Sequence, residues 1–324
     1  MATVMVTGVG AIIGYGALRS LKASHPSIQL VGADIFQDAV GQAWCDRFVQ
    51  APLTSDPNFP SWLERVVKQY EVDLIIPAIE QDVLYFSDNR SQIERLRCSV
   101  VLNTKSLIDL SSDKWAMDRD LQSINEPSRI PSVDNGSFTE VVEQVGLPFL
   151  LKPKRGYASK GIILVEDEAT FNQNRSEFGS VLIAQQLVGS DDREFTVSIF
   201  GDAEGGVLAM SCLRRRLAAD GSTVKAISEH HDGLVEVVKR LAQHFRPEGP
   251  TNFQFREVGH EWKLLEINPR ISSSTSIRTA FGYNESAMCV DYYLNGIRPS
   301  QPVILRGHAE RYIEEVVVLD RDHF

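Results

Sequence analysis

Short apolar runs alternate with amphipathic stretches over the first hundred residues of the chain. Residues 2–7, 28–33 and 73–78 are apolar runs bounded by turn residues, a pattern that predicts buried strands. Residues 58–70 carry apolar and aromatic side chains at helical spacing. Strands that alternate with helices are typical of a parallel, doubly wound sheet. We expect an N-terminal α/β domain over residues 1–104.

The remaining chain changes to an α+β pattern with antiparallel strands. Residues 149–152 and 162–165 predict two strands joined by a loop that contains glycine and lysine. Residues 251–257 and 261–267 predict a hairpin that turns at Gly259. The sequence therefore predicts two further domains, over residues 105–187 and 188–324.

The hairpin ends in a string of polar residues, Glu266-Ile267-Asn268-Pro269-Arg270. Residues two apart on a strand face the same side, so Glu266 and Asn268 share a face. Gln254 on the partner strand can add a third oxygen. Carboxylate and carboxamide oxygens are the ligands of magnesium, which binds through few protein groups and the phosphates of a nucleotide. The alternative is a hairpin with a polar solvent face.

Two lysines stand at positions that call for an anion. Lys152 lies in an otherwise apolar strand, and burying an unpaired ammonium group is costly. Lys114 lies at a predicted helix start, where the helix dipole favours anions over cations. A nucleotide phosphate would satisfy both lysines. For Lys114, a solvated surface position is the alternative.

The loop from Arg155 to Gly161 is built from small and basic residues. Small residues let backbone N–H groups approach phosphate oxygens closely. A loop between two strands can close over a nucleotide and exclude water. The alternative is an ordinary hairpin loop.

These motifs together resemble the ATP-grasp superfamily, and most closely its carbamoyl-phosphate-synthase-like and carboxylate–amine ligase branches. The resemblance covers nearly the whole chain through the order and spacing of several strings. They are Asp113-Lys114, Leu151-Lys152-Pro153, the Gly156–Gly161 loop, Gln185 to Gly189, Arg193 to Val197, Asn252 to Phe255 and Glu266 to Arg270. The resemblance implies a Rossmann-like pre-ATP-grasp domain followed by a two-lobed ATP-grasp domain.

The resemblance also implies roles for individual residues. For ATP it implies binding through Lys114, Lys152, Gly156, Ser159, Lys160, Gly161, Gln185, Gln186, Leu187, Val188 and Glu194. For Mg²⁺ or Mn²⁺ it implies the ligands Gln254, Glu266 and Asn268. Lys152 and Arg270 are the implied catalytic residues, which face the transferred phosphate. Arg215, Arg216, Lys225 and Arg278 are implied as cations on the substrate or phosphate side.

Three positions depart from the family pattern. Gln185 stands where relatives usually carry an acid, and Gln254 stands where other branches often carry one. Ser272, Ser273 and Ser274 replace a glycine pair common in relatives. That last region faces the acceptor, so the departure concerns the substrate.

A glycine turn follows the first predicted strand, with Gly8, Gly10 and Gly14 ahead of a helix. The spacing is a loose match to a dinucleotide-binding motif, and a helix N-terminus after glycines binds anions of several kinds. We expect Gly10 to contact substrate. Glu80 and Asp82 follow another strand and are candidates for binding an amine; a helix cap or a surface acid is the alternative.

Composition narrows the class of protein and its partners. The 324 residues carry a formal net charge of -10, which argues against a nucleic-acid partner. The four cysteines form no C-x-x-C pair, which predicts reduced, buried thiols in a cytoplasmic protein. We expect no signal peptide, no membrane partner, small carboxylate and amine substrates, and a possible homodimer.

We therefore expect an ADP-forming ligase that activates a small carboxylate as an acyl phosphate for attack by an amine. An ATP-dependent phosphotransferase or a non-catalytic ATP-binding protein is the alternative. An NAD(P)-dependent oxidoreductase would explain the N-terminal glycines and nothing from Lys114 onward.

Overall fold

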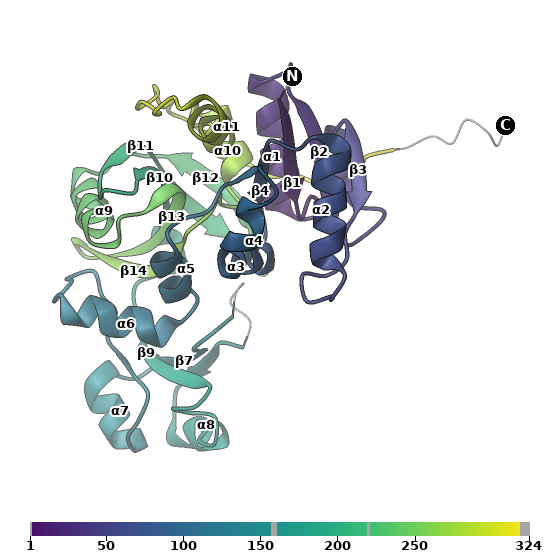
Figure 1. Cartoon of the computed structure of the whole chain (residues 1–324). Helices are drawn as coiled ribbons and strands as arrows, with labels where there is room; N and C mark the ends of the chain where they lie inside the picture. Colours follow the sequence, from purple (N-terminus) through teal and green to yellow (C-terminus); the bar gives the residue numbers. More distant parts are fainter. Residues whose placement is uncertain (1, 157–160, 219–220, 318–324) are drawn as a thin grey trace. The chain divides into compact units, whose positions relative to one another are not determined.

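The computed structural model describes residues 2–156, 161–218 and 221–317. Contacts divide the chain into two compact units, labelled by element in Figure 1. Unit 1 consists of Met1–Leu102 and Arg270–Phe324, and unit 2 consists of Asn103–Pro269. The division into domains 1–104, 105–187 and 188–324 stays a prediction beside these two units.

Unit 1 is built on a parallel sheet with the strand order β3-β2-β1-β4-β5. The strands are β1 (Thr3–Thr7), β2 (Gln29–Asp34), β3 (Arg47–Gln50), β4 (Leu74–Pro77) and β5 (Ser99–Val100). The helices are α1 (Ile12–Ser24), α2 (Phe59–Tyr70), α3 (Glu80–Asp88), α4 (Arg90–Glu94), α10 (Thr275–Ala280) and α11 (Glu285–Asn295), with the 3₁₀ turn η1 (Val40–Trp44) and the short strand β15 (His308–Glu310). β1 pairs with β2 on one side and β4 on the other, so the strand order reverses there. The predicted alternation of strands and helices is confirmed.

The glycine turn between β1 and α1 requires glycine at two positions. Gly8 has φ +63°, a conformation that side chains other than hydrogen disfavour. A Cβ atom on Gly14 would lie 2.3 Å from the carbonyl oxygen of Gly8. The Gly10 N–H donates to Oδ2 of Asp34 at 2.7 Å. The turn is therefore fixed by the end of β2 rather than by a helix cap.

Asp82 lies in the first turn of α3 and is 7% exposed. Burial raises its pKa to about 6, and the nearby Asp34 carboxylate adds to the shift. The carboxyl group therefore binds a proton in the folded protein at pH values where it has lost one in the unfolded chain. The stability that this proton provides is lost as the pH rises through about 6.

Asp82→Asn is expected to raise the free energy of unfolding at pH 8, by about 1–3 kcal/mol, because it removes the cost of burying the carboxylate. The gain is expected to be smaller at pH 5. Urea unfolding of both proteins at the two pH values measures it. Asp38→Asn, at an exposed acid of the same unit, is the control. A gain that does not grow with pH would contradict the burial argument.

Unit 2 contains two antiparallel sheets (Figure 1). The smaller sheet has the order β6-β9-β7-β8, with β6 (Ser132–Val133), β7 (Phe149–Pro153), β8 (Ile163–Val165) and β9 (Leu182–Gln186). Helices α7 (Phe138–Val145) and α8 (Glu168–Gln173) pack on it. Phe149, Phe171 and Phe178 are buried between the helices and the sheet. A small aromatic core therefore holds this lobe together.

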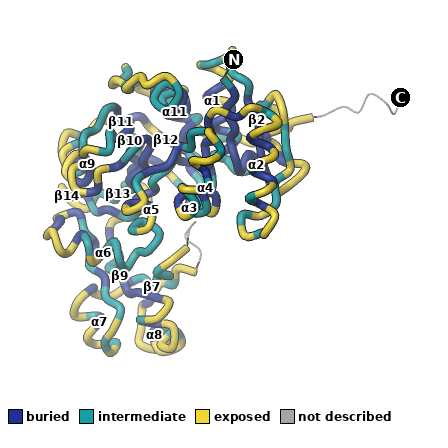
Figure 2. The backbone as a smooth tube through the Cα atoms, in the orientation of Figure 1, coloured by how far each residue is buried: buried dark blue, intermediate teal, exposed yellow. Residues whose placement is uncertain are grey.

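The larger sheet of unit 2 runs in the order β14-β13-β10-β11-β12. Its strands are β10 (Glu194–Asp202), β11 (Val207–Leu217), β12 (Thr223–Ser228), β13 (Glu248–Val258) and β14 (Glu261–Asn268). Apolar side chains of α9 (Asp232–Phe245), α5 (Lys105–Ser111) and α6 (Lys114–Ser123) share one core with the sheet. The central strand β10 is buried along nearly its whole length, and Figure 2 shows exposed stretches along α9. The predicted hairpin is confirmed as β13 and β14.

Candidate functional site

An open cavity in unit 2 is lined by strands of both its sheets. Its volume is about 170 Å³, smaller than the roughly 300–1,000 Å³ of typical ligand pockets. A nucleotide would therefore extend beyond it or widen it. Many of the predicted ATP and metal residues lie here: Lys114, Lys152, Gly156, Gln185, Gln186, Leu187, Val188, Glu194, Gln254 and Glu266. Further apolar side chains on the lining include Ile130, Leu150, Ile162, Leu217 and Leu265.

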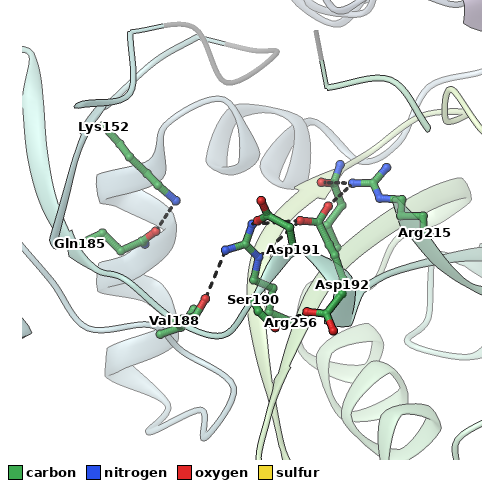
Figure 3. Close-up of polar contacts among 10 residues, drawn as sticks. Lys152, Gln185, Val188, Ser190, Asp191, Asp192, Arg215 and Arg256 are labelled. Carbon is green, nitrogen blue, oxygen red and sulfur yellow. Dashed lines mark hydrogen bonds and ion pairs between the residues drawn. The ribbon is translucent and has the colours of Figure 1, made fainter. Parts of the chain in front are cut away.

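Lys152 projects from β7 into this cavity. Its ammonium group donates to Oε1 of Gln185 at 2.6 Å (Figure 3). Gln185 in turn donates to the Ser132 hydroxyl at 3.0 Å. Burial and the nearby Lys114 together lower the pKa of Lys152 to about 8, with the Glu266 carboxylate opposing the shift. The hydrogen-bond partner of the Lys152 ammonium group, the Gln185 side chain, is neutral. An anion in the cavity would stabilise the charged form.

Lys114 reaches the same cavity from the first turn of α6. The helix is capped by Asp113, whose carboxylate accepts from the backbone N–H groups of Trp115 and Ala116. The Lys114 ammonium donates to the carbonyl oxygen of Gly156 at 2.8 Å. Lys114 therefore joins α6 to the start of the predicted phosphate loop. Gly161, at the other end of that loop, has φ +73°, and Ser159 and Lys160 lie outside the described residues.

A buried carboxylate lies between two arginines on the larger sheet. Glu194 on β10 is paired in register with Arg215 on β11 and with Arg256 on β13. Arg215 donates to Oε1 of Glu194 at 2.9 Å, and Arg256 donates to Oε2 at 3.3 Å and 3.4 Å. Arg256 also donates to the carbonyl oxygen of Val188 at 3.3 Å (Figure 3). Both carboxylate oxygens of Glu194 thus carry hydrogen bonds.

Arg256 is not among the site residues predicted from the sequence. The signal that could have found it is the alternation of β13, because Asn252, Gln254 and Arg256 are each two residues apart and face one side. Arg256 lines the cavity together with Gln254. Its contact with Val188, 68 residues earlier in the chain, had no sequence signal.

The predicted metal ligands lie on the paired strands β13 and β14. Gln254 is directly opposite Glu266, and Asn268 is opposite Asn252. Gln254 and Glu266 line the cavity, and the Gln254 oxygen accepts a hydrogen bond from Arg215 at 2.6 Å. An amide oxygen has a second lone pair, so this contact leaves room for a metal.

One carboxylate with neutral oxygens fits a magnesium ion held mainly by phosphates. The described residues contain no group of three or more His, Cys, Asp and Glu side chains arranged for a metal. A site of the zinc type, built from several such side chains, is therefore not seen in that part of the chain.

The remaining predicted substrate residues are scattered over both units. Arg216 and Lys225 are exposed register partners on β11 and β12. In unit 1, Arg278 is fully buried, with its guanidinium 3.8 Å from Glu285. Gly10 donates to Asp34, Glu80 begins α3, and Arg270 begins the second segment of the unit. Their roles toward a substrate stay predictions.

Two broader expectations can be compared with the described residues. All four cysteines are free thiols, as expected, but only Cys289 is fully buried. Among the helices described, none has the length and apolar character needed to cross a bilayer.

Comparison with known proteins gives consistent matches. Residues 177–316 match a family described as ATP-grasp in the biosynthetic pathway with Ter operon. The carbamoyl phosphate synthase large chain of Methanothermobacter thermautotrophicus is 24% identical over 296 residues, covering 83% of this chain. The chain spans about a quarter of that relative's length, 27%.

Solved structures share the fold over most of the chain. N5-carboxyaminoimidazole synthetase from Staphylococcus aureus, complexed with ADP, has a TM-score of 0.71 at 17% identity and covers 94% of this chain and 80% of its own. The biotin carboxylase domain of Hydrogenobacter thermophilus 2-oxoglutarate carboxylase was solved in complex with MgADP and bicarbonate. Its TM-score is 0.68 at 16% identity, and the match covers 94% of this chain and 73% of that domain's chain. An L-amino acid ligase from Bacillus licheniformis has a TM-score of 0.66 at 13% identity, and the match covers 91% of this chain and 74% of the ligase. Residues 177–316 thus match an ATP-grasp family, and the chain is similar in sequence to the large chain of carbamoyl phosphate synthase.

Proposed function

We propose that the chain binds Mg-ATP in the cavity of unit 2 and uses it to activate a small carboxylate for ligation to an amine. The observation that carries this proposal is Lys152, a desolvated ammonium group whose hydrogen-bond partner is the neutral Gln185. The side chains of Lys114 and Lys152 both line the cavity, in a chain whose net charge is -10. This charge pattern suits a polyphosphate.

Each group has a task that follows from its position. Lys152 and Lys114 would hold phosphate oxygens and stabilise the charge that develops during phosphoryl transfer. The segment Gln185–Val188 would meet the edge of the base, and Glu194 would accept from the ribose hydroxyls. The substrate carboxylate would attack the γ-phosphorus, which forms an acyl phosphate and releases ADP. An amine would then attack the acyl carbon and displace phosphate.

Glu266, Gln254 and Asn268 would hold magnesium, which neutralises charge on the phosphates. Arg270 would stabilise the transferred phosphoryl group, and the loop Arg155–Gly161 would exclude water from the acyl phosphate. We further infer that residues 1–104 act as a Rossmann-like pre-ATP-grasp domain that helps to hold the substrate. The presence of an L-amino acid ligase and a carboxyaminoimidazole synthetase among the structural neighbours supports ligation.

The test is release of ADP from Mg-ATP with pooled amino acids and small carboxylates. We expect ADP only when a pool is present, and we expect hydroxylamine to trap the acyl phosphate as a hydroxamate. ADP without hydroxamate would indicate phosphoryl transfer to another acceptor. Binding of Mg-ATP without ADP formation would indicate a non-catalytic protein, and NAD(P) reduction without ATP binding would contradict the proposal.

A further inference from the structure

Arg256 connects parts of the cavity that are distant along the chain. It donates to the carbonyl oxygen of Val188 at 3.3 Å and to the carboxylate of Glu194 at 3.3 Å and 3.4 Å. It also forms an ion pair with Asp191 (Figure 3). Its side chain is 19% exposed. One guanidinium therefore binds the segment after β9, the turn η2 (Asp191–Arg193) and the start of β10.

The segment after β9 passes directly over β13 at this arginine. Gly189 has φ +60°, and a Cβ atom there would lie 3.3 Å from Cβ of Arg256 and 3.2 Å from the carbonyl oxygen of Glu257. The close approach leaves the Val188 carbonyl within reach of the guanidinium. Removing the guanidinium would free both the carbonyl and one oxygen of Glu194.

The planar guanidinium suits this task better than an ammonium group would. Its nitrogens donate in fixed directions, so one side chain can bind a carbonyl and a carboxylate at once. Lysine carries the same charge on a flexible chain and lacks this fork. Arg215 holds the other oxygen of Glu194, so Glu194 keeps one ion pair when Arg256 is changed.

We propose that Arg256 is a positioning residue for the nucleoside half of the site, holding the Val188 segment and Glu194 in their binding arrangement before a nucleotide arrives. The inference rests on the proposed function, which assigns the base edge to Gln185–Val188 and the ribose to Glu194. Lys152 and Lys114 serve the phosphates. Arg256 therefore governs affinity for the base and sugar, and leaves affinity for the phosphate chain unchanged.

The experiment compares Mg-ATP with Mg-tripolyphosphate, which has the phosphates but no nucleoside. Titration calorimetry on the full chain should show that Arg256→Gln raises the Kd for Mg-ATP by roughly 10-fold or more, the effect expected for lost hydrogen bonds to a charged group. The Kd for Mg-tripolyphosphate should change by less than about 2-fold. With the substrate identified, KM for ATP should rise while kcat stays within a small factor.

Two further variants separate positioning from charge and from folding. Arg256→Lys keeps the charge and should recover little of the lost Mg-ATP affinity, since lysine lacks the fork. Arg240→Gln removes an arginine on α9 that binds Glu126 at 2.7 Å and 2.8 Å, outside the cavity. It should leave both Kd values unchanged and controls for the loss of an arginine–carboxylate pair.

Three results would overturn the inference: equal loss of affinity for both probes, unchanged affinity for Mg-ATP, or full recovery with lysine. Failure of the unmodified protein to bind Mg-ATP is a separate outcome. It would remove the proposed function itself, and the inference with it.

Discussion

Lys152→Met is expected to reduce ADP formation by at least about 100-fold, the scale of losing a group that stabilises transition-state charge. The side chain of methionine fills similar space but cannot bind phosphate. The unmodified ammonium is desolvated and held by a neutral amide, with Lys114 and Arg256 adding repulsion. The variant should therefore also be more stable at pH 7, by about 1–2 kcal/mol after solvent screening is allowed for.

The pH dependence of stability separates this account from simple loss of fold. The pKa of Lys152 is about 8 in the folded protein, below the 10.5 of an unperturbed lysine side chain. The unfolded chain therefore binds more protons between these values, and stability rises with pH there. The free energy of unfolding is measured against pH for the unmodified protein and for Lys152→Met. The difference between the two curves should show this rise alone. A variant that is unfolded at pH 7, or that keeps most of its activity, would contradict the account.

Glu266→Gln is expected to reduce Mg-ATP turnover by roughly 100-fold or more, because it removes the one carboxylate among the proposed metal ligands. Glutamine has nearly the same shape, so the pairing of β13 with β14 should remain. The reaction rate is measured as a function of Mg²⁺ concentration. The variant should need more Mg²⁺ to reach its own maximum.

Glu261→Gln on the same strand provides a matched control. Glu261 is 71% exposed and pairs with Lys263 at 2.7 Å. It is absent from the cavity lining. If Glu261→Gln keeps normal turnover while Glu266→Gln loses it, the result would support the role of Glu266 as a metal ligand. Equal turnover in both variants would contradict it.

The periodicity of the sequence predicted much of the fold because local patterns determine strands and amphipathic helices. The hairpin β13–β14 is confirmed, but an irregularity that skips Leu265 in β14, which no sequence pattern signalled, is what brings Glu266 opposite Gln254. The helix start at Lys114 was also predicted, and Asp113 proves to be its cap. The short helix α3 and strand β12 were missed, because neither has a clear apolar period.

Long-range contacts were not accessible from the sequence. Lys152 was predicted to lie in an apolar strand and is half-buried there, but its neutral partner Gln185 lies 33 residues away and could not be foreseen. Nothing in the sequence around Arg256 distinguishes it from other arginines on strands. Its contacts with Val188 and Glu194 appear only in the folded structure. Arg278 is fully buried with its guanidinium 3.8 Å from Glu285, a neighbour that no local pattern signals, and its role toward a substrate stays a prediction. Which charges meet depends on packing that no local pattern encodes.

The central claim is that the cavity of unit 2 binds the phosphates of Mg-ATP through Lys152. The most direct measurement is calorimetric titration of Mg-ATP into the unmodified protein and into Lys152→Met, without any second substrate. The account predicts one nucleotide bound per chain and affinity at least about 100-fold weaker in the variant, the loss of a charge-assisted phosphate contact. Equal affinity in the two proteins, or no binding to the unmodified protein, would contradict it.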